Sequence, residues 1–165
     1  MTKSIIATFE DVHTANRAIE RLYEDGFAQE HISMMVSDTT REKHLAIETH
    51  TKAPEGAAAG GVLGGTIGAI AAGLTAVAGL VIPGVGLAIA GPLVAALAGL
   101  GAGGAVGGLV GGLVGMGFTE TEAKLVGEAV EKGNIAVAVS DESNERIKVA
   151  HGVFESTSAL DIATM

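Results

Sequence analysis

The sequence contains no cysteine, and its basic residues are few and scattered. Without cysteine the chain forms no disulfide, no thiolate metal site and no cysteine nucleophile. The chain has ten lysine and arginine residues and nineteen acidic ones. The nearest approach to a cluster of basic residues is Arg41, Lys43 and Lys52. Because phosphate backbones are bound by clustered basic residues, we expect no nucleic-acid partner.

An export signal is also missing from the beginning of the sequence. The apolar residues around Ile5 are followed closely by Glu10 and Asp11. A secretory signal instead carries a longer apolar core after its basic start. We therefore expect that the charged parts of the chain stay on the cytoplasmic side.

The longest absence is one of charge, since no Asp, Glu, Lys, Arg or His occurs between Glu55 and Glu120. Of the 25 glycines, 21 lie inside this run, and every charge lies in the flanks, which are both acidic. Proline removes backbone donors and glycine loosens the chain, so a break is expected near the middle. The pattern predicts two helices, at about 56–82 and 93–118, joined by a turn. The turn residues are Pro83, Gly84, Gly86, Gly91 and Pro92.

The glycines of this run recur every four residues. Ten glycines in the second helix would cost on the order of 10 kcal/mol relative to alanine in an exposed helix. Small residues at this spacing form a groove in which two helix backbones touch, and that contact offsets the cost. The predicted helix-packing and oligomerisation residues are Gly60, Gly64 and Gly68 in the first helix and Gly99, Gly103, Gly107, Gly111 and Gly115 in the second.

Two interpretations of this glycine-zipper hairpin remain open. Each helix exceeds the roughly 20 residues that cross a hydrocarbon core, which predicts a transmembrane hairpin with lipid and further copies of the chain as partners. Glycine is only weakly lipophilic, however, and the tip has no charge to hold it in water. The alternative is therefore a soluble, cytoplasmic homo-oligomer, a cage, ring or filament in which the hairpins bury one another.

Two other interpretations of the run are weaker. A flexible glycine linker would carry serine, glutamine and charge, whereas branched apolar residues are interleaved here with the glycines. A water-filled channel would need a polar lining, and only Thr66 and Thr75 offer one. The run therefore favours packed helices.

The two flanks predict the folded part of the chain. The first reads as a strand at 4–9, a helix capped by Asp11 and a strand at 32–37. The second reads as a helix opened by the capping box of Thr119 and Glu122, a strand at 135–140, a helix capped by Asp141 or Ser140, and a strand at 160–163. This order predicts an α+β fold, a ferredoxin-like plait (βαβ-α-βαβ) interrupted by the Gly/Ala-rich helical hairpin. Its parts are the first half, 1–55, the hairpin, 56–118, and the second half, 119–165.

No catalytic or cofactor site emerges from the sequence. The spacing Gly99-Leu-Gly101-Ala-Gly103-Gly104 matches a dinucleotide-binding motif, but no strand precedes it and no acid follows at the expected distance. His44, Glu48 and His50 are the nearest approach to a metal site and fit a solvated linker better. We expect no enzyme activity, no cofactor, no metal and no small-molecule substrate. A ligand-binding plait domain is a remote alternative.

Three stretches of the chain resemble bacterial general-stress proteins, including those called low-temperature-induced. They are Ala7–Asp11 continuing through Ala18-Ile19 to Gly26-Phe27 and Ile32-Ser33, then Ile82–Gly86 with Ala90–Leu93, and finally Gly117-Phe118 through Glu128 and Gly133 to Val137. The resemblance covers nearly the whole chain. It implies a stress-associated protein with a glycine-rich hydrophobic core and no catalytic residues to transfer. For the transmembrane interpretation it implies a bacterial inner membrane, with the charged domain on the cytoplasmic side.

Overall fold

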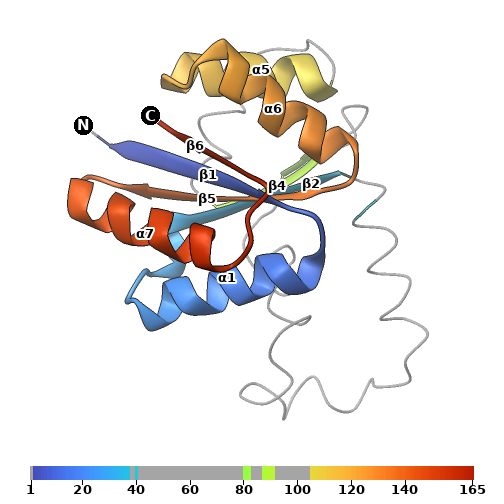
Figure 1. The fold of residues 1–165 in the computed structure, drawn as a ribbon. Helices are drawn as coiled ribbons and strands as arrows, with labels where there is room; N and C mark the ends of the chain where they lie inside the picture. The colour runs from blue at the N-terminus through green and yellow to red at the C-terminus, as the bar shows by residue number, and fades with distance from the viewer. Residues whose placement is uncertain (1, 38–39, 41–79, 83–86, 92–104) are drawn as a thin grey trace, which may run out of the picture.

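A six-stranded antiparallel sheet forms the centre of the molecule (Figure 1). The computed structural model describes residues 2–37, 40, 80–82, 87–91 and 105–165. Along the sheet the strand order is β3-β4-β2-β5-β1-β6, so strands from both flanks alternate in one sheet. The strands are β1 (Lys3–Phe9), β2 (Ile32–Ser37), β3 (Leu80–Ile82), β4 (Leu87–Ala90), β5 (Ile135–Asp141) and β6 (Asp161–Thr164).

Helices cover both faces of this sheet (Figure 1). On one face lie α1 (Val12–Glu24) and α7 (Asn144–Ser156), and on the other lie α5 (Ala105–Met116) and α6 (Glu120–Glu131). A short 3-10 turn, η1 (Gln29–His31), leads into β2. The predicted α+β class is confirmed by this layered arrangement.

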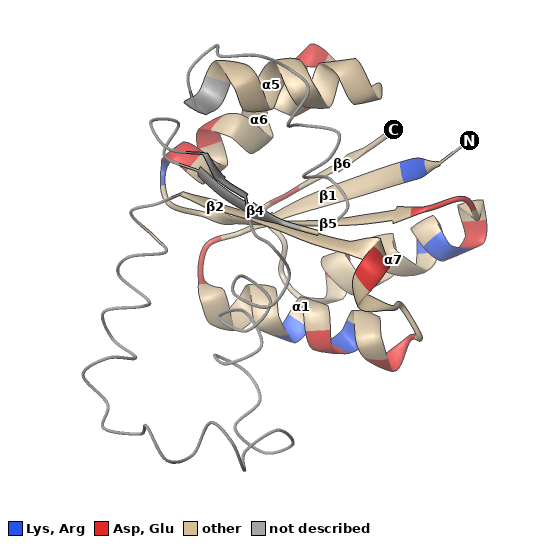
Figure 2. Ribbon diagram, turned by 180° about the vertical axis from the view of Figure 1, so that it is seen from behind, with Lys and Arg blue, Asp and Glu red and all other residues tan. Residues whose placement is uncertain are grey.

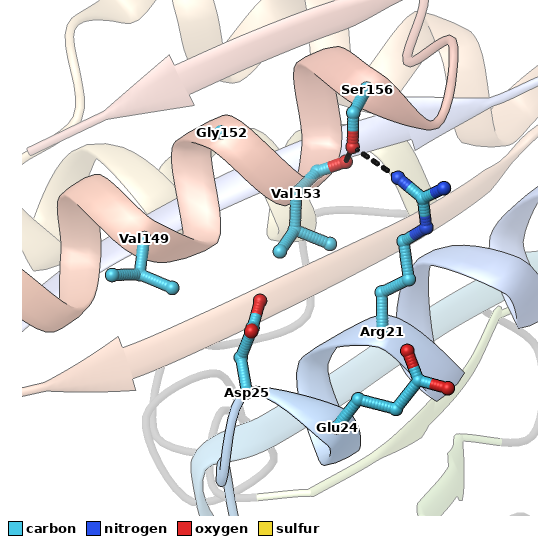
Figure 3. A pocket seen from close by; sticks show the side chains of 7 residues that line it. All are labelled: Arg21, Glu24, Asp25, Val149, Gly152, Val153 and Ser156. Atoms are coloured by element: carbon cyan, nitrogen blue, oxygen red, sulfur yellow. Dashed lines mark hydrogen bonds between the residues drawn. The ribbon is translucent and has the colours of Figure 1, made fainter.

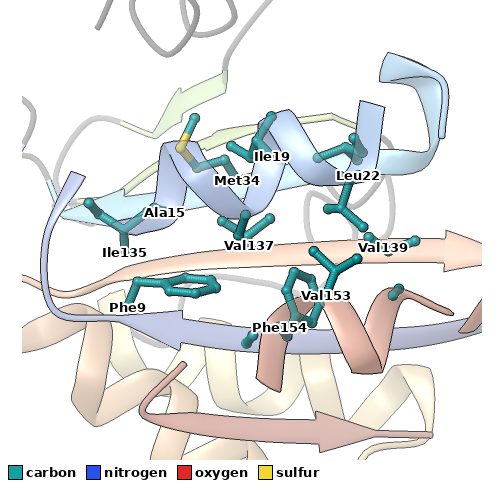
Figure 4. Packing of buried hydrophobic residues seen from close by; sticks show 14 of the residues in the cluster. Phe9, Ala15, Ile19, Leu22, Met34, Ile135, Val137, Val139, Val153 and Phe154 are labelled. Atoms are coloured by element: carbon teal, nitrogen blue, oxygen red, sulfur yellow. The ribbon is translucent and has the colours of Figure 1, made fainter. Parts of the chain in front are cut away.

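The first core lies between the sheet and the pair α1 and α7 (Figure 4). Alternate residues of each central strand point into it, because side chains of a strand alternate between the two faces. Phe9 of β1 and Phe154 of α7 meet edge to face, with ring centroids 5.9 Å apart, and both are fully buried. The predicted apolar face of the first helix is also buried, and consists of Ala15, Ala18, Ile19 and Leu22.

The second core lies on the opposite face, below α5 and α6. Here β5 contributes only alanines, Ala136 and Ala138. Small side chains on the strand leave room for the larger Val126 and Val130 of α6. Leu109 and Leu113 of α5 complete this core, and their burial fixes which side of α5 faces inward.

Helix capping agrees with the sequence at two of three places. Asp11 caps α1 by accepting a hydrogen bond from the Thr14 amide at 2.9 Å, and Thr119 with Glu122 forms the predicted capping box of α6. The cap of α7 is Ser143, so the prediction of Asp141 or Ser140 was wrong. Strand β5 continues through Asp141. The Asp141 carboxylate accepts a hydrogen bond from the Ser143 amide and does not cap the helix.

Asp141 is the centre of a polar cluster that ties the two flanks together. Its Oδ2 accepts from Arg146 Nε at 2.7 Å and lies 3.7 Å from His31 Nδ1. The Arg146 guanidinium donates to the Gly26 carbonyl at 3.2 Å and stacks over the ring of Phe27, 4.2 Å from its centroid. The cluster thereby fixes the start of α7 against the end of α1.

Asp141→Asn is expected to lower the free energy of unfolding by about 1.5 kcal/mol at neutral pH, since charged hydrogen bonds are lost. Hydrogen bonds from the Ser143 amide, then from Arg146, lower the pKa of Asp141 below its ordinary value of 3.8. A lowered carboxyl pKa stabilises the fold above the unfolded-state pKa, and this stability is lost as pH falls through the folded-state pKa. The difference between native chain and variant should therefore shrink as the pH falls below 3.8. Urea titrations at pH 7 and pH 3, with the exposed Asp161→Asn as control, measure it; an equal difference at both pH values would contradict the assignment.

A β-hairpin replaces the predicted turn between two helices. Residues 80–82 were expected to end the first helix, but they form β3, and Leu87–Ala90 form β4. The hairpin extends the sheet, because β4 pairs with β2 from Met34↔Ala90 to Ser37↔Leu87. Two short apolar runs on either side of Pro83 and Gly84 fit a hairpin. The apolar residues that flank both runs hid this signal.

The prediction of transmembrane helices is also wrong. Among the residues that the structure describes, no helix combines the length and apolar character needed to cross a bilayer. In place of the second predicted helix, 93–118, the described residues form the 12-residue α5, which ends at Met116. Gly117 at φ 114° then reverses the chain into α6.

Candidate self-association surface

Helix α5 has no polar side chain anywhere along its length. Its sequence is AVGGLVGGLVGM, with five glycines among 12 residues. A surface helix normally carries charged or polar residues opposite its apolar stripe, and one without them is normally buried all round. Charged residues do occur on α1 and α7, as Figure 2 shows. The composition of α5 therefore predicts that its outer side is covered too.

The inner side of α5 is defined by leucine. Leu109 and Leu113 are 3% and 0% exposed and pack into the second core with Ile6 and Met35. Residues two apart on a helix point about 200° apart, so Gly107 and Gly111 lie nearly opposite these leucines. The glycines consequently face outward, where they are exposed.

Open space lies in front of the outward glycines. A Cβ atom added at Gly107 or at Gly111 would meet no atom within 4 Å. Gly115 is exposed as well, and beside this row Val114 is 42% exposed. We call this surface, made of Gly107, Gly111, Val114 and Gly115, the glycine face of α5.

The turn after α5 sets the orientation of this face. The Phe118 amide donates to the Leu113 carbonyl at 3.1 Å, and the Gly117 amide donates to the Val114 carbonyl at 3.0 Å. These two bonds form a Schellman cap, with glycine in the left-handed region. Phe118, 3% exposed, anchors the turn in the second core. The capping box of Thr119 follows at once, so α5 and α6 are held as a rigid pair.

Three of the eight predicted packing glycines lie on this face, namely Gly107, Gly111 and Gly115. Gly60, Gly64, Gly68, Gly99 and Gly103 fall outside the described residues. So do four predicted turn residues, Pro83, Gly84, Gly86 and Pro92. The fifth, Gly91, follows β4 and lies against the backbone of β2, rather than in a turn between helices. The exposed Val114 was not singled out from the sequence, although its four-residue spacing from Val110 is visible there.

Sites for other chemistry are weaker in the described part of the chain. No three His, Cys, Asp or Glu side chains there could hold a metal ion. His44, Glu48 and His50 lie outside it, as does the motif at residues 99–104. A groove of about 430 Å³ runs between α1 and α7 (Figure 3). Arg21 donates to the Ser156 hydroxyl at 2.8 Å, and that hydroxyl donates to the Val153 carbonyl at 2.9 Å. Val149 and Val153 also line the groove. This open groove contains no convergent catalytic groups.

Comparison with known proteins adds no further constraint. No protein-family model, no curated protein sequence and no solved structure matches the chain. The resemblance to general-stress proteins therefore stays a prediction from the residues alone, and function has to be argued from the glycine face.

Proposed function

We propose that this protein is a non-enzymatic, self-assembling structural protein whose copies join through the glycine face of α5. The observation that carries the proposal is the exposure of Gly107 and Gly111 on a helix with no polar side chain. Five glycines cost such a helix on the order of 5 kcal/mol relative to alanine when it is exposed to water. Contact with a second copy offsets this cost by dispersion along the touching backbones.

A second copy is the occupant that fits this face best. Val110 and Val114 form a ridge beside the groove of Gly107 and Gly111, and each pair is four residues apart, or about 6 Å along the helix. In an antiparallel pair of α5 helices, Val114 of one copy can lie on Gly107 of the other, and Val110 on Gly111. Each ridge then fills the other groove, as ridges-into-grooves packing requires. A parallel pair would instead place valine against valine.

We also propose that the part of the fold presenting this face is a ferredoxin-like plait. The strands from the two flanks follow the order β2-β5-β1-β6, all antiparallel. That order, with α1 and α7 together on one face, supports the plait. In this proposal α6 is the extra helix between the halves, and α5 docks onto it.

Association with stress is the biological setting that we propose for the assembly. Its support is the resemblance carried by the stretches around Phe9, Pro83 and Phe118. In this setting the protein would act by forming an assembly rather than by turning over a substrate.

Cysteine mapping tests the proposal, because the native chain has no cysteine. Gly107→Cys and Val114→Cys variants are mixed and oxidised. The antiparallel register predicts disulfides between position 107 of one copy and position 114 of another, exceeding the cross-links within either variant alone. Glu145→Cys on α7, far from the face, is the control and should stay unlinked. Cross-links no more frequent at α5 than at this control would reject the glycine face as an interface.

A further inference from the structure

Methionine is the only residue type that brings sulfur into this chain, which has no cysteine. Two methionines of β2 are sealed inside the protein, since Met34 is 6% exposed in the first core and Met35 is 0% exposed in the second. Met116 and Met165 are only partly buried and pack against the second core. Because an oxidant must reach the sulfur, these four methionines divide into a protected pair and an accessible pair.

Met116 is the last residue of α5 and lies on the buried side of that helix. It follows Leu113 by three residues and Leu109 by seven, and these spacings place all three side chains on one face. The two leucines are buried in the second core, whereas Met116 stays partly open to solvent. Met116 therefore closes the apolar contact of α5 with the sheet at the end where the chain turns into α6.

Met165 lies at the same turn, although it follows β6. Its amide donates to the Ser4 carbonyl at 3.0 Å, which continues the pairing of β6 with β1. A Cβ atom added at Gly117 would lie 3.3 Å from Met165 Sδ, so the sulfur occupies space that a side chain at residue 117 would need. Met116 and Met165 together hold the turn between α5 and α6 against the second core.

We propose that Met116 and Met165 form an oxidation site through which a peroxide loosens α5 from the sheet. A lone pair of the thioether sulfur attacks one peroxide oxygen, an S–O bond forms and the O–O bond breaks. The leaving oxygen takes the proton and departs as water or an alcohol. The sulfur loses two electrons, the peroxide gains them, and the product is a sulfoxide, which is polar where the thioether was apolar.

A sulfoxide at either position conflicts with the present packing. Its oxygen is a hydrogen-bond acceptor, and burying an acceptor without a donor costs free energy. The nearby amides of Gly117 and Phe118 are already used in the helix cap. The oxidised side chain therefore turns toward water and loses its contacts with the second core. A methionine sulfoxide reductase reverses the change by oxidising two thiols to a disulfide, which restores the thioether and releases water.

Loosening of α5 also changes the glycine face, and this consequence rests on the proposed function. Gly107 and Gly111 face outward because Leu109 and Leu113 on the opposite side are docked in the second core. Oxidation should therefore weaken the assembly as well as the fold. The oxidation site itself does not depend on assembly, because both methionines contact the second core within one copy.

Peptide mass mapping of the full chain after brief treatment with hydrogen peroxide tests the site. Sulfoxide should form at Met116 and Met165 at least tenfold faster than at Met34 and Met35, which serve as internal controls. The chain oxidised at the accessible pair should unfold at a temperature about 5 °C lower, and methionine sulfoxide reductase with dithiothreitol should restore it. Equal oxidation rates at all four residues, or an unchanged unfolding temperature, would overturn the inference.

Met116→Leu combined with Met165→Leu removes both accessible sulfurs at nearly constant volume. This variant should keep its unfolding temperature and its sedimenting mass after peroxide treatment. The matched control, Met34→Leu combined with Met35→Leu, should respond to peroxide as the native chain does. A peroxide response of the first variant as large as the native one would refute the site. If the untreated native chain sediments as a monomer, the proposed assembly fails, while mapping and unfolding still decide the oxidation site.

Discussion

Gly91→Ala is expected to lower the free energy of unfolding by about 3 kcal/mol, from positive-φ strain and overpacking together. Gly91 has a φ of 96°, which L-residues rarely adopt. A Cβ atom there would lie 2.6 Å from Ser33 Cα and 2.7 Å from Ser33 Oγ, and would also collide with the Ile32 carbonyl oxygen. The backbone of β2 cannot move aside without breaking its pairing with β5. The hairpin of β3 and β4 should therefore detach or the whole fold should weaken.

Gly26→Ala is the matched control for this prediction. Gly26 also has a positive φ, 80°, but a Cβ there would meet no atom within 4 Å. Only the backbone strain remains, at about 1 kcal/mol. Urea denaturation of both variants measures the difference. If the two cost the same, the close approach of Gly91 to β2 would be wrong, and with it the placement of the hairpin on the sheet edge.

Gly107→Leu combined with Gly111→Leu should abolish assembly while leaving the fold intact. Both positions face open space within one copy, so leucine fits there, and it has a higher helix propensity than glycine by almost 1 kcal/mol per residue. In the assembly the same side chains would fill the groove and separate the helices. The variant should therefore sediment without the α5 contact and unfold at the same or a higher temperature.

Leu109→Ala combined with Leu113→Ala is the control for the buried side of α5. Both leucines are buried within one copy, so the pair should lower the free energy of unfolding by about 5 kcal/mol, at 2–5 kcal/mol for each buried leucine. Sedimentation and thermal unfolding of the two double variants separate the two sides of α5. If the Gly107→Leu/Gly111→Leu variant assembles like the native chain, the glycine face is not the interface.

Much of the flanking fold could be predicted because its signals are local. The Asp11 cap and the apolar face predict the helix of residues 12–24, and the capping box at Thr119 predicts the start of α6. The cap of α7 was misplaced because Ser140, Asp141 and Ser143 are all good capping residues. Which of them caps the helix depends on where β5 ends, and pairing with β1 carries that strand through Asp141.

The secondary structure of the glycine-rich run could not be predicted from local signals, for a different reason. Without charges, nothing marks where an element starts, and short apolar runs fit a strand or a helix equally well. The strands at Leu80 and Leu87 form because β2 offers an edge to pair with, which is a tertiary effect. Spacing alone could not fix the outward side of α5. Within α5, Gly107 and Gly108 belong to two parallel four-residue series, and only the docking of Leu109 onto the sheet decides that the predicted Gly107 series is the exposed one.

The central claim is that the glycine face of α5 joins copies of the chain, and the mass of the unmodified protein in solution tests it most directly. Sedimentation equilibrium of the full chain over a wide concentration range measures that mass. The account predicts multiples of 16.4 kDa that decrease only on dilution. A single species of 16.4 kDa at every concentration would contradict it, because no second copy would then cover the glycines of α5.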